Sequence, residues 1–270
     1  MASRIWFITG TSRGFGRVWA EAALRRGDKV AATARDVRAL APLSAEFGSS
    51  VLPISLDVTQ RESVDSAINQ AADHFGGLDV VVCNAGYGLF ATVEETSESA
   101  ARQQFETNFF GVLWTVQSAL PVLRRQRTGH LLVVSSLAGV TTFPTAGVYN
   151  ASKWAVEGLC ETLAKETEAF GIKTTLVEPA GYATDWRGSS AKHEPHMPEY
   201  DELRQRLASA YGKRPLGDPQ ATAEAILRCV DDKSPPLRLL LGEPALATVK
   251  TVYADRLATW EAWSEVSART

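Results

Sequence analysis

The sequence predicts an α/β fold: a doubly wound parallel sheet of about seven strands with helices on both faces. Short apolar runs rich in β-branched residues alternate with longer helical patterns along most of the chain. A glycine-rich turn follows the first of these runs directly. Several later runs also end in polar residues, and the carboxyl ends of parallel strands are where such sheets bind ligands. Regular alternation of this kind favours right-handed crossovers between parallel strands.

The composition is that of an ordinary globular domain. The 270 residues are 45% hydrophobic and 22% charged, enough to bury a sizeable core, and no linker-like run divides them. We therefore expect one domain over residues 1–270. A net charge of −3 and an isoelectric point near 5.9 give no electrostatic reason to expect nucleic acid or an anionic membrane as a partner.

Membrane insertion and secretion are not indicated either. No apolar run approaches the ~20 residues that span a bilayer, and the chain enters its first strand too early for a signal peptide. Cys83, Cys160 and Cys229 are far apart and odd in number, so they fit neither a disulfide framework nor a zinc pattern. These features favour a cytoplasmic location.

The first element is a strand at residues 5–9, and a helical pattern then runs to Arg26, with Gly27 as its stop. The turn between them reads T-G-T-S-R-G-F-G. Its glycines allow the backbone to approach a phosphate at the positive end of the helix dipole. The spacing is Gly-x-x-x-Gly-x-Gly rather than the common Gly-x-Gly-x-x-Gly, and a tight turn without a ligand is the alternative. The cofactor-binding residues expected in the turn are Gly10, Ser12, Arg13, Gly14, Phe15 and Gly16.

The second strand, at residues 29–34, indicates which dinucleotide the turn binds. Dinucleotide-binding folds often place an acidic residue at the end of this strand, where it holds the adenosine ribose. Here Arg35 follows the strand, and Arg13 lies in the glycine-rich turn. Two guanidinium groups suit the 2'-phosphate of NADP, whereas Asp36 is better placed to cap the next helix. We therefore expect NADP, with NADPH preferred over NADH.

Two further strands bring residues to the same edge of the sheet. The third, at residues 51–56, ends in an aspartate that can accept a hydrogen bond from an adenine amino group or cap the helix expected at residues 60–75. The fourth, at residues 79–83, is followed by an Asn-Ala-Gly turn. The cofactor-binding residues expected here are Asp57, Val58, Asn84, Ala85 and Gly86.

The most informative stretch follows an apolar strand at residues 131–134. Ser136 comes just after this strand, and a helical pattern opens with Tyr149 and places Lys153 four residues later, on the same helix face. A free phenol has a pKa of ~10 and is a poor acid or base at neutral pH. A nearby cation favours the phenolate, so we expect Lys153 to bring the pKa of Tyr149 towards the working range. Ser136 can hold a substrate oxygen by hydrogen bond, although a tyrosine and a lysine that merely share a helix would show the same spacing.

A long helical stretch reaches Arg127 and carries Asn108 in the sequence N-F-F-G. Asparagine followed closely by glycine is unfavourable inside an apolar helix. This break predicts a kink or a functional polar group, and a hydrogen-bonded core asparagine is the alternative.

A further strand at residues 173–178 runs into Pro179-Ala180-Gly181, and from residue 185 to residue 215 the alternation breaks down. A long polar insertion of this kind is typical of a lid or a binding loop. The segment is rich in aromatic residues, which favours an apolar substrate of small to moderate size. Residues elsewhere that support this expectation are Tyr87, Leu89, Phe90 and Phe143.

His193 and His196 of this segment could suggest a metal, but Pro195 discourages the helical face that such ligands need, and no third ligand is evident. We expect no metal site. The C-terminal part predicts a helix at residues 218–230, a strand at 237–241 and a helix at 244–263. Two tryptophans of the last helix, Trp260 and Trp263, are expected in the core or in a subunit contact.

Taken in order, these motifs resemble those of the short-chain dehydrogenase/reductase family, from Ile5 to about Thr184. The resemblance implies a single-domain Rossmann fold and hydride transfer between a nicotinamide cofactor and a carbonyl or alcohol. The motifs that carry it are Thr9-Gly10-x-x-x-Gly14-x-Gly16, Asp57, Asn84-Ala85-Gly86, Asn108, Ser136, Tyr149-x-x-x-Lys153, and Pro179-x-Gly181 with Thr184.

The resemblance also implies a role for each matching residue. Tyr149 resembles the general acid/base, and Lys153 its partner, which lowers the pKa of the tyrosine and binds the nicotinamide ribose. Ser136 resembles the serine that orients the substrate, and Asn108 the position that holds a water of the proton relay. Thr184 resembles the threonine that contacts the nicotinamide carboxamide, and Pro179 and Gly181 belong to the same cofactor loop. The pair Arg13 and Arg35 resembles the NADP-preferring branch.

The sequence therefore predicts an NADP(H)-dependent oxidoreductase that acts on a small-molecule carbonyl or alcohol. Family members commonly pair through the helix that begins with Tyr149, so a homodimer or homotetramer is expected. One alternative is a 3-oxoacyl thioester reductase, which the acidic segment at residues 194–202 does not favour because a carrier protein would need a basic docking patch. Another is an NADP-binding sensor without turnover, which the presence of both Tyr149 and Lys153 does not favour.

Overall fold

The computed structural model describes residues 3–211 and 215–269 of the chain. Seven strands form one sheet in the order β3-β2-β1-β4-β6-β7-β9, and every neighbouring pair is parallel. The strand order runs outward in opposite directions from β1 and β4, so the predicted doubly wound sheet is confirmed. The strands are β1 (Ile5–Ile8), β2 (Lys29–Ala34), β3 (Val51–Ser55), β4 (Val80–Cys83), β6 (Gly129–Val134), β7 (Ile172–Pro179) and β9 (Arg238–Leu241).

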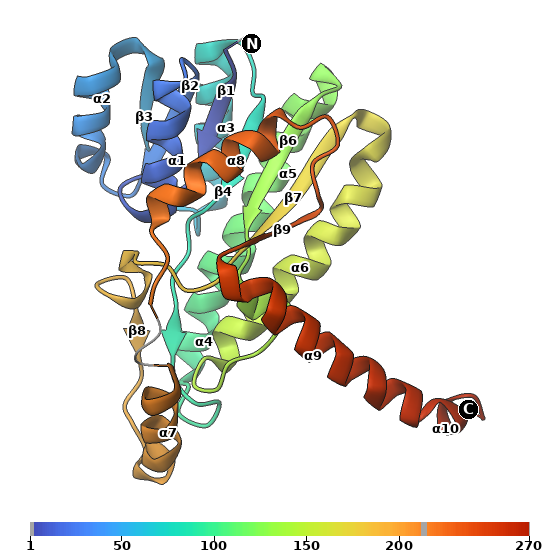
Figure 1. The fold of residues 1–270 in the computed structure, drawn as a ribbon. Coiled ribbons are helices and arrows are strands. Elements are labelled where there is room, and N and C mark those ends of the chain that lie inside the picture. The colour runs from blue at the N-terminus through green and yellow to red at the C-terminus, as the bar shows by residue number, and fades with distance from the viewer. Residues whose placement is uncertain (1–2, 212–214, 270) are drawn as a thin grey trace.

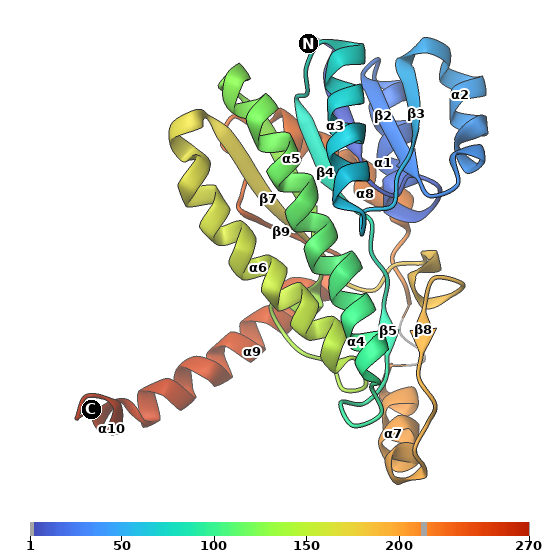
Figure 2. The same cartoon turned by 180° about the vertical axis from the view of Figure 1, so that it is seen from behind.

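Helices cover both faces of this sheet, as Figures 1 and 2 show from opposite sides. One face carries α1 (Gly14–Arg25), α2 (Ala41–Phe47) and α8 (Thr222–Asp231). The other face carries α3 (Arg61–Phe75), α5 (Gly111–Gln126) and α6 (Gly147–Thr167). The observed bounds differ from the predicted ones mostly by one or two residues at each end, where helices and strands fray.

Side-chain alternation along the strands divides the core into two apolar layers. Phe7 and Val81 pack under α3, α5 and α6, whereas their neighbours Trp6 and Val80 pack under α1 and α8. Successive side chains of a strand point to opposite faces, so a strand buried on both faces must be apolar throughout. This explains why the short apolar runs were reliable signals for strands.

The irregularity predicted around Asn108 is present. The chain forms α4 (Glu98–Phe105), then a π-helical turn at Glu106–Phe110, and then α5. A π turn inserts an extra residue into the helix and is frequently found at functional sites. Its position follows from the N-F-F-G sequence, which disfavours a continuous α-helix at this point.

The segment predicted as a lid packs against the stretch that follows β4. Its strand β8 (Lys192–His193) pairs in parallel with β5 (Leu89–Phe90), and a helix, α7 (Asp201–Tyr211), follows. Figures 1 and 2 both show this unit below the carboxyl edge of the main sheet. We call residues 185–211 the lid segment, and residues 212–214 of the predicted lid lie outside the described part of the chain.

The C-terminal helix α9 (Glu243–Ala262) extends away from the body of the protein and is followed by the short helix α10 (Ser264–Ser267) (Figure 1). Trp260 and Trp263 are 67% and 62% exposed, so the expectation that they lie in the core is wrong. Helix α9 contacts the body up to Arg256, which stacks on Trp154 and donates to the Val140 carbonyl oxygen. Beyond that point the helix has left the body, and its tryptophans have no core to enter.

Candidate active site

Tyr149, Ser136 and Lys153 meet at the carboxyl end of β6. Ser136 follows that strand, whereas the first turn of α6 carries Tyr149 and its second turn Lys153. Tyr149 is 5% exposed and forms a hydrogen bond with Ser136. The Lys153 Nζ lies 5.9 Å from the centre of the Tyr149 ring and donates to the Val134 carbonyl oxygen at 2.8 Å. The constellation predicted from spacing is therefore assembled in space.

The pKa values of the two groups correct one expectation. Burial raises the pKa of Tyr149 to about 12, and the hydrogen bond with Ser136 acts in the opposite direction. Burial lowers the pKa of Lys153 to about 8, and the charge of Glu157 opposes this. The expected lowering of the Tyr149 pKa by Lys153 is not found in this structure, where removal of the phenol from water is the largest influence on that pKa.

Asn108 is fully buried in the π turn, and its side chain holds the backbone that follows β4. Its Nδ2 donates to the Tyr87 carbonyl oxygen at 3.0 Å, and its Oδ1 accepts from the Tyr87 N–H at 3.1 Å. A Cβ on Gly86 would lie 3.1 Å from Asn108 Oδ1 and 3.8 Å from Lys153 Nζ. Asn108 is thus a hydrogen-bonded core asparagine, and it also lines the approach to Lys153.

The Asn84 side chain forms hydrogen bonds with the backbone of the glycine-rich turn. The Asn84 Nδ2 donates to the carbonyl oxygens of Thr9, at 2.8 Å, and Gly10, at 3.0 Å. A Cβ on Gly16 would lie 2.4 Å from the Gly10 carbonyl oxygen and 2.5 Å from Asn84 Nδ2, so no larger residue fits there. Asn84 therefore supports the shape of the turn with its side chain.

The outer side of the same turn is uncrowded at Gly14. Gly10 and Gly14 adopt positive φ angles, +72° and +60°, which favour glycine. The nearest atom to a Cβ on Gly14 would be Thr184 Cβ at 3.9 Å. Gly14 is therefore uncrowded on this side, at the N-terminus of α1 and close to Thr184.

Three of the predicted cofactor residues have side chains engaged within the protein. The ring of Phe15 stacks on Trp19 at 5.2 Å between centroids and packs against the core. Only the backbone of Phe15 is therefore left to contact a cofactor at the turn. Asp57 Oδ1 accepts from the Thr59 N–H at 3.0 Å and from its hydroxyl at 2.8 Å. Val58 is buried and packs where a Cβ on Gly111 would touch it. Asp57 therefore does not cap α3, whose N-cap residue is Gln60; its side chain stabilises the turn before the helix, and a contact with adenine stays a prediction.

Of the two predicted cations, Arg13 lies in the turn and Arg35 directly follows β2. Arg35 is exposed directly after β2, and Asp36 caps the following turn by accepting from the Arg38 N–H at 3.0 Å, as expected. Arg13 is half-exposed, and its Nη1 donates to Ser189 Oγ at 2.8 Å and lies 3.4 Å from Asp185 Oδ2. The lid segment therefore contacts the cation expected to bind the 2'-phosphate. Ser12, beside Arg13, is exposed.

The lid segment also reaches the candidate acid. The Trp186 ring lies 4.9 Å from the Tyr149 ring and 5.1 Å from that of Phe90, and Phe90 stacks on His193. Thr184 Oγ accepts from the Trp186 N–H at 3.4 Å. Pro179 is buried at the end of β7, and Gly181 follows it towards the lid segment. The walls of the site are thus largely aromatic.

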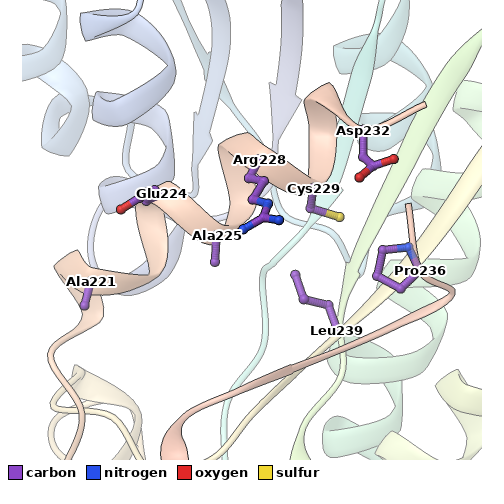
Figure 3. Close-up of a pocket in the computed structure, with 8 residues that line it drawn as sticks. All are labelled: Ala221, Glu224, Ala225, Arg228, Cys229, Asp232, Pro236 and Leu239. Atoms are coloured by element: carbon purple, nitrogen blue, oxygen red, sulfur yellow. The ribbon is translucent and has the colours of Figure 1, made fainter. Parts of the chain in front are cut away.

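Within residues 3–211 and 215–269, no three His, Cys, Asp or Glu side chains are grouped as metal ligands would be. A pocket of about 410 Å³ lies elsewhere, between α8 and β9, and contains none of the predicted site residues (Figure 3). Its lining residues include Glu224, Arg228 and Asp232. Because the chemistry-bearing residues meet at the carboxyl end of β6, this outer pocket is not the candidate active site.

Sequence reasoning did not identify two buried carboxyl groups, Glu157 and Glu178, that pair with the partly exposed Arg238 near Lys153. A signal was present, since Glu157 stands four residues after Lys153, and Glu178 ends an apolar run. It also did not identify Glu95, whose buried carboxylate pairs with Arg204 of α7 and fastens the lid segment.

The comparisons with known proteins agree with this fold. The short chain dehydrogenase family model matches residues 4–195, and the chain belongs to this family of oxidoreductases. The oxidoreductase BOA17 of Botryotinia fuckeliana (strain B05.10) is 40% identical over 270 residues, covering 98% of each chain. A crystal structure of a short-chain dehydrogenase from Streptomyces avermitilis is 35% identical, with a TM-score of 0.92, and the match covers 100% of this chain and 99% of that one.

A third relative carries a cofactor. A short chain dehydrogenase/reductase from Burkholderia phymatum, solved in complex with NAD, is 26% identical, with a TM-score of 0.83 and 95% of each chain covered. Solved members of the family include complexes with NAD and with an NADP derivative, so the family binds nicotinamide cofactors of both kinds.

In the described residues, no helix is long and apolar enough to cross a membrane.

Proposed function

We propose that the protein is an NADP(H)-dependent oxidoreductase that interconverts a carbonyl and an alcohol on a small to medium apolar substrate, with Tyr149 as the general acid/base. The observation that carries this proposal is the meeting of Tyr149, Ser136 and Lys153 at the carboxyl end of β6, one strand away from the Asn84–Gly86 segment that follows β4. Tyrosine, serine and lysine together can orient a carbonyl oxygen and supply its proton.

The cofactor would supply the hydride. Its diphosphate would lie at the glycine-rich turn, between Gly14 and Thr184, and its nicotinamide end near Gly86, Tyr149 and Lys153. The geometry that supports this is the uncrowded side of Gly14 and the approach of Gly86 to Lys153. Asp57 and Val58 would border the adenine.

The 2'-phosphate would be held by Arg13 and Arg35, which supports the choice of NADP. A phosphate placed there would compete with Asp185 and Ser189 for the Arg13 guanidinium. Charge-assisted hydrogen bonds of arginine to phosphate are the strong kind, so the phosphate should displace these exposed partners.

In the reduction direction, Tyr149 would give its phenolic proton to the substrate oxygen, and the Ser136 hydroxyl would hold that oxygen in place. A pKa of about 12 keeps Tyr149 protonated at neutral pH, which suits an acid. Lys153 would stabilise the phenolate once the proton has left. Asn108 would hold the backbone beside Lys153, where a water could restore the proton.

The lid segment would cover the substrate. Trp186 and Phe90 form an apolar wall over Tyr149, and Phe143 packs beside Tyr149 as well. These contacts support an apolar substrate. A carrier-protein thioester is not favoured as substrate, because the lid around Glu194 and Glu199 is acidic. A sensor without turnover is not favoured either, because the Tyr149 phenol and the Lys153 ammonium are both in place.

Self-association as a homodimer or homotetramer is also part of the proposal. Helix α6 exposes Trp154, α9 exposes Leu257 and Trp260, and Trp263, directly after α9, is exposed as well. Exposed apolar residues on neighbouring surfaces support a subunit contact. A cytoplasmic location is proposed from Cys83, Cys160 and Cys229, which are all free and buried. Light scattering after size-exclusion chromatography would give the mass of the assembly.

The test of the function is the change in nicotinamide absorbance with NADPH and with NADH, across a panel of ketones, aldehydes and quinones. We expect oxidation of NADPH with apolar carbonyl compounds and a clear preference over NADH. Tight binding of NADPH with no turnover on any compound, in either direction, would favour the sensor instead.

A further inference from the structure

Glu157 and Glu178 form a pair of buried carboxyl groups near Lys153, on α6 and β7. Glu157 lies on α6, one turn beyond Lys153, and Glu178 lies in β7; their exposed fractions are 5% and 2%. Both face Arg238 of β9, whose Nε donates to Glu157 Oε2 at 3.0 Å and lies 3.5 Å from Glu178 Oε1. Two carboxyl groups therefore converge on one guanidinium.

Three oxygens of this cluster are buried and have no hydrogen-bond partner in good geometry within the described residues: Glu157 Oε1, Glu178 Oε1 and Ser135 Oγ. Glu157 lies close enough to Ser135 and to Glu178 for polar contact with both. Unpaired carboxylate oxygens are costly to bury, and two close carboxyl groups share a proton because both cannot ionise easily. A proton held by Glu178 would give these oxygens a donor. In agreement, burial together with the charge of Glu157 raises the pKa of Glu178 to about 8.

The space around Glu157 is fitted closely. A Cβ on Gly139 would lie 2.6 Å from Ser135 Oγ and 3.1 Å from Glu157 Oε1. Arg238 is held on its outer side by Glu161, whose Oε2 accepts from Nη2 at 2.8 Å. The carboxylate of Glu157 is thus fixed between Gly139 and Arg238.

Glu157 also acts on Lys153, since residues four apart share one face of a helix. Burial lowers the pKa of Lys153, and the charge of Glu157 raises it. The other titratable or charged groups that the described residues place around the pair are Tyr149, Cys160 and Glu161 on α6, Glu178 on β7 and Arg238 on β9. Glu157 is the largest opposing influence on the buried ammonium.

We propose that Glu157 is a positioning residue for Lys153: its carboxylate, held by Arg238 and relieved of repulsion by the proton on Glu178, keeps Lys153 in the ammonium form at neutral pH. The importance of that charge for turnover rests on the proposed function. The charge itself can be measured without turnover, so the two proposals can fail separately.

The test compares the wild type with Glu157→Gln and with Glu161→Gln, a matched control one turn further along α6 that also contacts Arg238. Each protein is labelled with ε-¹³C lysine, and the Lys153 resonance is identified by its loss in Lys153→Arg. We expect the pKa of Lys153 to fall by roughly one unit in Glu157→Gln, the size of shift that a nearby charge produces, and to stay unchanged in Glu161→Gln. The basic limb of the pH profile of kcat/KM should move by the same amount.

Equal titration of Lys153 in the wild type and Glu157→Gln, or an equal shift in the Glu161→Gln control, would overturn the proposal. If Glu157→Gln does not fold, Glu178→Gln provides a second test, because it keeps the Glu157 carboxylate in place. The pKa of Lys153 must then stay or rise, and a fall would contradict the proposal. A shifted Lys153 pKa without turnover in any variant, wild type included, would count against the proposed function alone.

Discussion

The indole of Trp186 lies against the phenol ring of Tyr149, with the ring centroids 4.9 Å apart and the planes tilted by 56°. Trp186 comes from the lid segment and Tyr149 from the start of α6, so this contact joins the cover of the site to its candidate acid. Phe90 packs on Trp186 edge to face at 5.1 Å. The lid thus contributes to the burial that raises the pKa of Tyr149.

Replacing Trp186 by alanine should weaken turnover of apolar carbonyl compounds. Apolar pocket contacts of even one methylene are worth about 1–3 kcal/mol, so we expect kcat/KM to fall about tenfold or more. The pKa of Tyr149 should also fall, because the phenol becomes more exposed to water. Steady-state kinetics over a range of pH measures both effects. Trp260→Ala, an exposed tryptophan on α9, is the control, and equal kinetics in the two variants would exclude Trp186 from the substrate site.

The cofactor preference should depend on Arg13 and Arg35. Loss of a hydrogen bond to a charged group costs about 1.5–3 kcal/mol, so Arg13→Ala and Arg35→Ala should each weaken NADPH binding about tenfold or more and leave NADH binding unchanged. Asp185→Asn should tighten NADPH binding, because it frees Arg13 from a competing carboxylate. Fluorescence titration with both cofactors measures this.

Arg38→Ala is the matched control for that series, since Arg38 is an exposed cation of the same region that pairs with Asp36. A parallel loss of NADH affinity in Arg13→Ala and Arg35→Ala would show that the two cations do not recognise the 2'-phosphate.

Glu95 should hold the lid segment closed. Its carboxylate accepts from the Arg204 guanidinium and from the N–H groups of Met197, at 2.7 Å, and Thr92, at 2.9 Å. Glu95→Gln replaces the ionised partner of Arg204 by a neutral one, so amide hydrogen exchange over residues 185–211 should become faster, and the KM for apolar substrates should rise. Glu98→Gln, which removes an exposed ion pair on α4, is the control. Unchanged exchange in the lid of Glu95→Gln would contradict this role.

Glu178 should make stability dependent on pH. Its folded pKa of about 8 is above its ordinary value of 4.5, so its contribution to stability is fully present below pH 4.5 and is lost as the pH rises through 8. The wild type should therefore lose more stability between pH 5 and pH 9 than Glu178→Gln does. Thermal unfolding at several pH values tests this, with Glu161→Gln as control. Parallel curves for the wild type and Glu178→Gln would mean that Glu178 is ionised in the folded protein.

The sheet, and the edge at which its polar residues emerge, could be predicted because the central strands are buried on both faces. An apolar, β-branched run such as that of β6 has few alternatives to a central strand, and Ser136 must then come out at its carboxyl end. The spacing of Tyr149 and Lys153 was sufficient to predict that the two side chains lie together, because helix geometry places residues four apart on one face. A break in the helix at Asn108 was predictable from the sequence. The π form of the turn was not, and neither were the hydrogen bonds of Asn108 to the Tyr87 backbone, which joins a distant segment.

The remaining features depend on contacts between distant segments. The pairing of β5 with β8 involves two residues on each side, too few for a periodic signal. The pKa of Tyr149 was predicted from its neighbour in sequence, whereas the burial that decides it depends on tertiary packing, which includes Trp186 of the lid. Trp260 was expected in the core or in a subunit contact because tryptophan is largely buried on average; the core is excluded because α9 leaves the body before Trp260, and the subunit contact stays a prediction.

The central claim, that Tyr149 delivers the proton to the substrate oxygen, is tested most directly by Tyr149→Phe. The measurement is the rate of NADPH oxidation with a carbonyl compound that the wild type reduces, together with the affinity of each protein for NADPH. General acid catalysis contributes typically about 10²–10⁴-fold, so we expect at least that loss of kcat while NADPH binding is largely retained. Turnover by Tyr149→Phe at the wild-type rate would contradict the claim, because another group would then supply the proton.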